Sequence, residues 1–85
     1  MKLDVPEWLA RRGGEIIRGV NEGNWLVLLD GKPQYRVNLK PARGAFTYAI
    51  TQTVNGREVA GGRVFPTLED ALRGGLDHLR ESLGW

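Results

Sequence analysis

Apolar and polar positions alternate through the middle of the chain and predict a β-sheet. Residues 24–29, 34–40, 45–54 and 57–65 form four segments with strand composition, and the second and third of them alternate strictly. The pairs Asp30-Gly31 and Asn55-Gly56 lie between strands and are typical of tight hairpin turns. The pattern therefore predicts an antiparallel sheet of four strands, with a bend or bulge at Gly61-Gly62 in the last strand.

Residues 67–83 have the period of an amphipathic helix. Thr67 is placed to cap its start, with Asp70 three residues later. Gly75 lies on the apolar side, which predicts that the helix approaches a strand closely there. The leucines that share one face are Leu68, Leu72, Leu76, Leu79 and Leu83. This pattern predicts a helix packed on one face of the sheet.

The first twenty residues are less clear. Residues 5–12 predict a short helix that ends at Gly13-Gly14. Residues 15–20 fit either a strand or a bent continuation of the helix, so a fifth strand is possible. The whole chain, 1–85, is then one α+β domain: a sheet of four or five strands, the C-terminal helix on one face, and the N-terminal helix against an edge or the other face.

The strand at 24–29 is apolar on both sides. The alternation favours placing Leu26 and Leu28 on the helix-covered face with Val37. Trp25 and Val27 then lie on the opposite face, beside Arg36 and Lys40. That face is covered by the N-terminal segment, or it contacts a second copy, another protein or a nucleic acid.

The last strand poses a conflict between a regular hairpin and the burial of Arg63. A two-residue turn at Asn55-Gly56 would pair Tyr48 with Arg63 and direct the guanidinium toward the helix. An unpaired buried Arg is costly. We therefore expect a bulge at Gly61-Gly62 that turns Val64 inward and Arg63 outward.

Composition removes most catalytic and metal chemistry. The chain has no Cys and a single His, and Ser82 is its only serine. Disulfides, zinc–thiolate sites, Cys nucleophiles and Ser–His systems with a spare His have too few residues to form. We therefore expect no enzyme activity, no catalytic residue, no metal and no cofactor. No apolar run approaches the roughly 18–20 residues of a membrane span, and the start is not a signal peptide, so a cytoplasmic protein without membrane contact is expected.

Positive charge is concentrated in the predicted sheet. Residues 31–63 carry six basic side chains against Glu58 alone, a net charge of +5 within a chain of net charge +2. Such a surface could bind phosphates, with Trp25 stacking on a base. The candidate residues for contact with a partner or a nucleic acid are Trp25, Val27, Arg36, Lys40, Arg57 and Arg63.

A limited resemblance to known families lies in the same region. The segment Tyr35-Arg36-Val37, followed by the hairpin and by residues 64–72, resembles DNA-binding modules of the integrase-arm type, which have three strands and a helix. That resemblance implies that Arg36, Lys40 and Arg57 would enter the major groove. Residues 67–72 also resemble the helix start of HicB-type antitoxin domains.

The residue pattern favours a small, non-enzymatic binding module that acts through its sheet surface. The apolar residues of the first strand favour a protein partner or a homodimer, as in a regulator or inhibitor. The alternative is a nucleic-acid-binding domain that uses the basic sheet face, for which affinity should fall steeply with rising salt.

Overall fold

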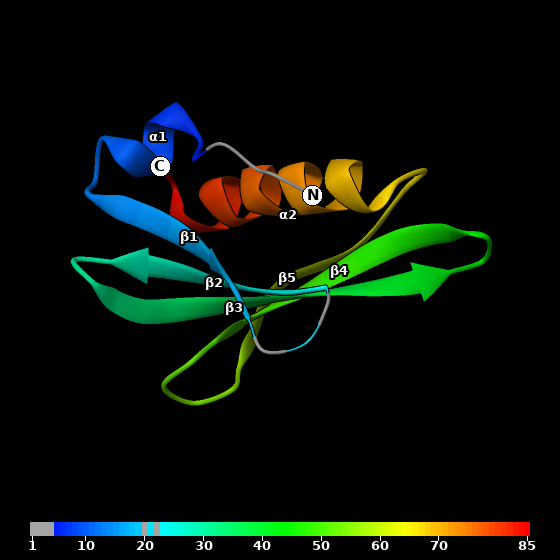
Figure 1. Ribbon diagram of the computed structural model, residues 1–85, viewed down its shortest axis with the longest axis horizontal. Helices are drawn as coiled ribbons and strands as arrows, with labels where there is room; N and C mark the ends of the chain where they lie inside the picture. The colour runs from blue at the N-terminus through cyan, green and yellow to red at the C-terminus, as the bar shows by residue number, and fades with distance from the viewer. Residues whose placement is uncertain (1–4, 20, 22) are drawn as a thin grey trace.

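The computed structural model describes residues 5–19, 21 and 23–85 and has an α+β fold. Its five strands are antiparallel and lie in the sheet in chain order, β1-β2-β3-β4-β5 (Figure 1). The ambiguous segment after the first helix is therefore a strand, and Val20 at its end lies outside the described residues. The elements are α1 (Glu7–Ala10), β1 (Gly14–Arg18), β2 (Asn24–Leu29), β3 (Lys32–Ala42), β4 (Ala45–Gln52), β5 (Glu58–Phe65) and α2 (Leu68–Leu83).

Both helices lie on the same face of the sheet. In Figure 1, α2 runs along that face and α1 sits beside its C-terminal end, above β1. Of the two predicted positions for α1, the structure has the one at an edge. Leu9 of α1 is fully buried and belongs to the same apolar cluster as the leucines of α2. The helices therefore form one layer that covers one side of the sheet.

The β2–β3 hairpin corrects the predicted orientation of β2. Asp30 and Gly31 both have positive φ, as a tight hairpin turn of this kind requires, and Leu29 pairs with Lys32. A bulge then places Gln34 as an extra residue on β3, so that Val27 pairs with Tyr35 and not with Gln34. Because successive side chains alternate, this single extra residue exchanges the two faces of β2 relative to β3.

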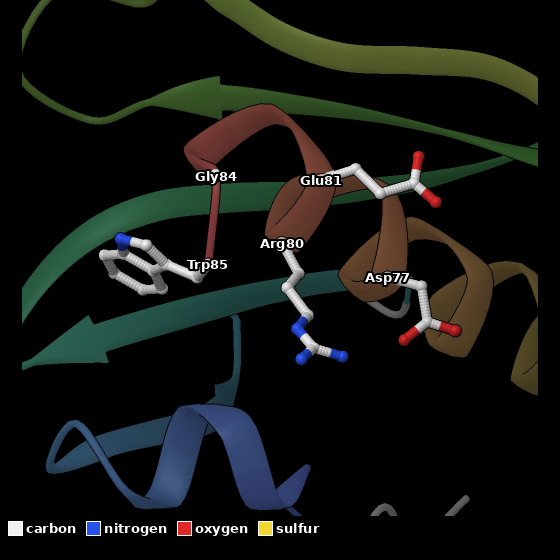
Figure 2. Close-up of a pocket in the computed structure, with 5 residues that line it drawn as sticks. All are labelled: Asp77, Arg80, Glu81, Gly84 and Trp85. Atoms are coloured by element: carbon white, nitrogen blue, oxygen red, sulfur yellow. The ribbon is translucent and has the colours of Figure 1, made fainter.

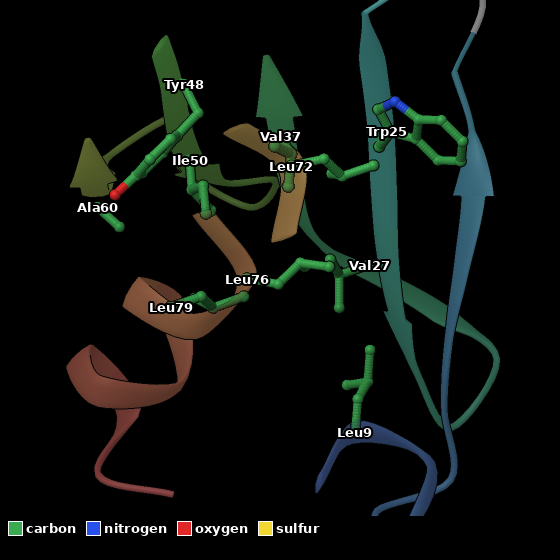
Figure 3. Packing of buried hydrophobic residues seen from close by; sticks show 10 residues of the cluster. All are labelled: Leu9, Trp25, Val27, Val37, Tyr48, Ile50, Ala60, Leu72, Leu76 and Leu79. Atoms are coloured by element: carbon green, nitrogen blue, oxygen red, sulfur yellow. The ribbon is translucent and has the colours of Figure 1, made fainter. Parts of the chain in front are cut away.

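The core consequently contains the residues expected on the opposite face. Trp25 is 7% exposed and Val27 is 1% exposed. Figure 3 shows Leu72 and Leu76 of α2, and Leu9 of α1, pointing toward β2 where these two side chains lie. The prediction that Trp25 and Val27 face away from the helices is wrong, and Leu26 and Leu28 occupy that position instead.

The β4–β5 hairpin also departs from the prediction. β4 ends at Gln52, so the loop is longer than two residues. The bulge predicted at Gly61-Gly62 is confirmed, with Gly62 at a φ of +91°, and a further bulge interrupts the pairing of β5 nearer the loop. Val64 therefore points away from the helices and is 55% exposed, not inward as expected. Arg63 reaches α2, where its Nη2 lies 3.1 Å from Glu81 Oε2, so the guanidinium is paired at the surface.

The beginning of α2 and its contact with the sheet confirm the prediction. The Thr67 hydroxyl accepts a hydrogen bond of 3.1 Å from the backbone N–H of Asp70. At Gly75 a Cβ would lie 3.0 Å from Cγ of Tyr48 on β4. Glycine thus allows α2 to rest directly on the Tyr48 ring.

Candidate functional site

The face of the sheet opposite the helices is a candidate binding surface. No element of the described part of the chain lies over it, and both helices are on the other side (Figure 1). Pairing and alternation assign its residues. This surface, called the open face below, consists of Glu15, Ile17, Leu26, Leu28, Arg36, Asn38, Lys40, Thr47, Ala49, Thr51, Glu58, Gly61 and Val64.

The apolar residues of the open face gather on β1 and β2. Ile17 pairs directly with Leu26, and Leu28 follows two residues further along β2. Ile17 is 43% exposed, and both leucines are half-buried within the sheet. Neighbouring branched side chains on adjacent strands form a continuous apolar surface, which is typical of a contact area for another protein.

The charges of the open face balance. Arg36 and Lys40 project from β3, while Glu15 and Glu58 lie on β1 and β5. The face therefore carries two cations and two carboxylates, unlike the strongly basic surface expected from the sequence. A balanced surface favours contact with a protein over contact with a phosphate backbone.

The six predicted site residues do not form one group. Trp25 and Val27 are in the core, where the folded chain hides them from a partner. Arg57 belongs to the β4–β5 loop, where its N–H donates to Asn55 Oδ1 at 2.9 Å. Arg63 is paired with Glu81 on the helix side. Only Arg36 and Lys40 lie on the open face. No observation therefore favours the nucleic-acid alternative, which stays a prediction.

A tyrosine–histidine pair is the main polar contact beneath α2. Tyr48 Oη lies 2.7 Å from Nδ1 of His78, and the two rings meet edge to face. Burial raises the pKa of the Tyr48 hydroxyl, which Arg63 lowers and Glu81 raises to smaller extents. The hydroxyl therefore stays protonated at neutral pH and serves to connect β4 to α2 rather than to act as a base.

The described residues contain neither a metal-binding cluster nor a membrane-spanning helix. No group of three or more His, Asp or Glu side chains in residues 5–19, 21 and 23–85 could hold a metal ion. Within the same ranges, no helix has the length and apolar character needed to cross a membrane.

Sequence reasoning missed Ile17, Leu26 and Leu28 as surface residues. The signal was present, because a strand that is apolar on both sides indicates a second contact surface. Its two faces could not be told apart without the position of the bulge at Gln34. Ile17 was further hidden by the ambiguity between helix and strand at residues 15–20.

Comparison with known proteins adds no family to these observations. No protein-family model, no curated protein sequence and no solved structure matches the chain.

Proposed function

We propose that the protein is a small, non-enzymatic binding module that self-associates through its open face. The observation that carries the proposal is the uncovered apolar group formed by Ile17, Leu26 and Leu28 on β1 and β2. Water is excluded from these side chains when a second copy lies against them. Val64, at the other side of the face, adds a further exposed apolar side chain.

The charges of the open face suit a second copy as the occupant. Each copy presents Arg36 and Lys40 together with Glu15 and Glu58. Two such faces can place opposite charges against each other, because cations and carboxylates are equally numerous on both. A uniformly basic face would instead repel its own copy.

The size of the chain gives a physical reason for association. A domain of 85 residues buries only roughly 60–65% of its unfolded surface on folding. In the described part of the chain the helices cover only one face of the sheet, so the other face contributes less to burial. Association through that face would remove its apolar side chains from water and so add to the surface that the chain buries.

The mass in solution tests the proposal. We expect the wild-type mass to rise from one to two chains as its concentration increases to about 1 mM, and Ile17→Lys to stay monomeric. Val54→Lys is the matched control, because Val54 is 88% exposed at the β4–β5 loop and lies outside the open face. Circular dichroism should show that both variants fold.

Two results would overturn the proposal. One is a wild-type protein that remains monomeric throughout the concentration range. The other is an equal loss of association in Ile17→Lys and Val54→Lys, which would place the contact elsewhere or make it a non-specific effect of charge.

A further inference from the structure

A pocket lies between α1 and the C-terminal end of α2, away from the open face. Its volume is about 320 Å³, and its lining residues come from both ends of the chain. They are Trp8, Arg11, Arg12, Arg80 and Trp85. Figure 2 shows the adjoining hollow that shares Arg80 and Trp85; Arg80 extends there toward the side on which α1 lies.

The two tryptophans form an aromatic wall. Their ring centroids are 6.0 Å apart and the ring planes are inclined by 60°. The guanidinium carbon of Arg12 lies 4.1 Å from the centre of the Trp85 ring, a cation–π contact. The wall therefore offers planar groups, both indole and guanidinium, against which a planar ligand can stack.

The pocket also has cationic groups without a carboxylate partner. Arg11 is paired with Glu7 at 2.7 Å. Among the described residues, neither Arg12 nor Arg80 forms an ion pair, and neither has another interaction at its guanidinium beyond the stacking of Arg12. Of the two carboxylates that line the adjoining hollow with Arg80, Glu81 is engaged by Arg63, and Asp77 forms no ion pair with any described residue. Two guanidinium groups are thus available to an anion.

The indole of Trp8 is partly packed against the apolar cluster behind this wall. Trp8 Nε1 is buried and has no hydrogen-bond partner, the only such side-chain atom in the described part of the chain. Buried polar groups in folded proteins are nearly always paired, because an unpaired donor costs about 1–3 kcal/mol. Because this atom is inaccessible to water, it faces the packed side of the ring and not the open pocket, and a ligand in the pocket would contact the ring and not this N–H.

We propose that this pocket binds a small planar aromatic anion: a ring system that carries a phosphate or a carboxylate. The ring stacks against the Trp8–Trp85 wall, and the anionic group binds Arg12 and Arg80. The volume suits one ligand of this size and lies at the lower end of the range for small-molecule sites. The proposal does not depend on self-association, because none of these residues belongs to the open face.

Indole N–H resonances in a ¹H–¹⁵N NMR titration provide the test. The probes are adenosine 5′-monophosphate and 2-naphthoate, which carry the two anionic groups, with adenosine and inorganic phosphate as the half-ligands. We expect saturable shifts of Trp8 and Trp85 with at least one of the two aromatic anions, and little change at Trp25 in the core. Each half-ligand should bind at least tenfold more weakly. Binding of only one aromatic anion identifies the anionic group that the pocket accepts.

Two arginine variants and a control complete the test. Arg12→Gln and Arg80→Gln should each weaken binding of the effective probe about tenfold, as expected for the loss of one charged contact. Arg73→Gln, on the same helix but paired with Glu69 at 2.6 Å, should bind as the wild type does. The proposal is overturned if neither aromatic anion shifts Trp8 and Trp85 at about 10 mM. It is equally overturned if a half-ligand binds as tightly, or if all three variants behave alike.

Discussion

Tyr48 is the residue at which the apolar core meets the polar contact under α2. The residue is 2% exposed, its ring packs on Gly75, and its hydroxyl lies 2.7 Å from Nδ1 of His78. Phe65 lies beside the same ring, with a centroid distance of 6.1 Å. One side chain therefore contributes burial, a close helix contact and a hydrogen bond, so changes at this position should affect both packing and pH dependence.

The raised pKa of Tyr48 predicts a loss of stability at alkaline pH. Burial, the largest cause, and Glu81 favour the protonated hydroxyl, and Arg63 opposes them. Because the folded-state pKa is above its ordinary value of 10.0, the stabilising contribution is complete below that pH and is lost as pH rises through the raised pKa. Urea denaturation at a series of pH values should show this fall. In Tyr48→Phe the fall should be shallower, with a cost of about 1 kcal/mol at neutral pH for the lost hydrogen bond. An equal alkaline fall in both proteins would contradict the prediction.

At the scale of elements, bulges and a glycine decide how the sheet and α2 fit together. One bulge in β3 and two in β5 set which side chains face the helix. Gly75 then permits the helix axis to come close to β4, because no side chain separates it from Tyr48. The glycine also lowers the intrinsic stability of the helix, because glycine disfavours helix by about 1 kcal/mol relative to alanine.

The substitution Gly75→Ala tests which effect on stability is larger: the loss of the close contact with Tyr48 or the gain in helix propensity. A Cβ would lie 3.0 Å from the Tyr48 ring, which is held by His78 and by its burial. Overpacking of this kind costs about 1–3 kcal/mol, against a gain of about 1 kcal/mol in helix propensity. We expect a net destabilisation of about 1 kcal/mol by chemical denaturation. Ser82→Ala, at an exposed position of the same helix, should be neutral or slightly stabilising. If Gly75→Ala stabilises the protein as Ser82→Ala does, the close approach of α2 to Tyr48 does not require glycine at position 75.

At the scale of the whole molecule, the described residues form one helical layer and one sheet, with an apolar cluster between them. Residues from α1, α2 and four of the strands meet in that cluster. The opposite side of the sheet stays open, and the aromatic pocket lies where the two ends of the chain meet. The described residues therefore present two separate surfaces: the open face, which we propose contacts a second copy, and the cationic pocket, which we propose binds a small anion.

Paired substitutions on β2 test this two-sided arrangement. Trp25→Ala should cost about 3 kcal/mol, because it removes a large side chain from the core. Leu26→Ala, the next residue but on the open face, should cost about 1 kcal/mol. Both free energies of unfolding should be measured at low protein concentration, so that association does not contribute. A larger cost for Leu26→Ala than for Trp25→Ala would reverse the two faces of β2.

Much of the fold follows from local physical chemistry and could be read from the sequence. Strand composition, alternation and the hairpin turns predict the four main strands, the leucine period predicts α2, and Thr67 predicts its first turn. The apolar position of Gly75 predicts a close approach to a strand, although the sequence does not show that the neighbour is Tyr48. These features depend on residues that are near each other in the chain, so the pattern alone determined them.

The functional surfaces depended on tertiary structure. Trp25 and Val27 were placed on the wrong side because one extra residue, Gln34, exchanges the faces of β2, and the sequence does not show where a strand admits a bulge. Arg63 of β5 forms an ion pair with Glu81 of α2, and Trp8 contacts Trp85 at the opposite end of the chain. The sequence by itself determined which elements form and which strand is apolar on both sides. Only the folded chain decided which of those sides is buried, because that depends on register and on contacts between distant residues.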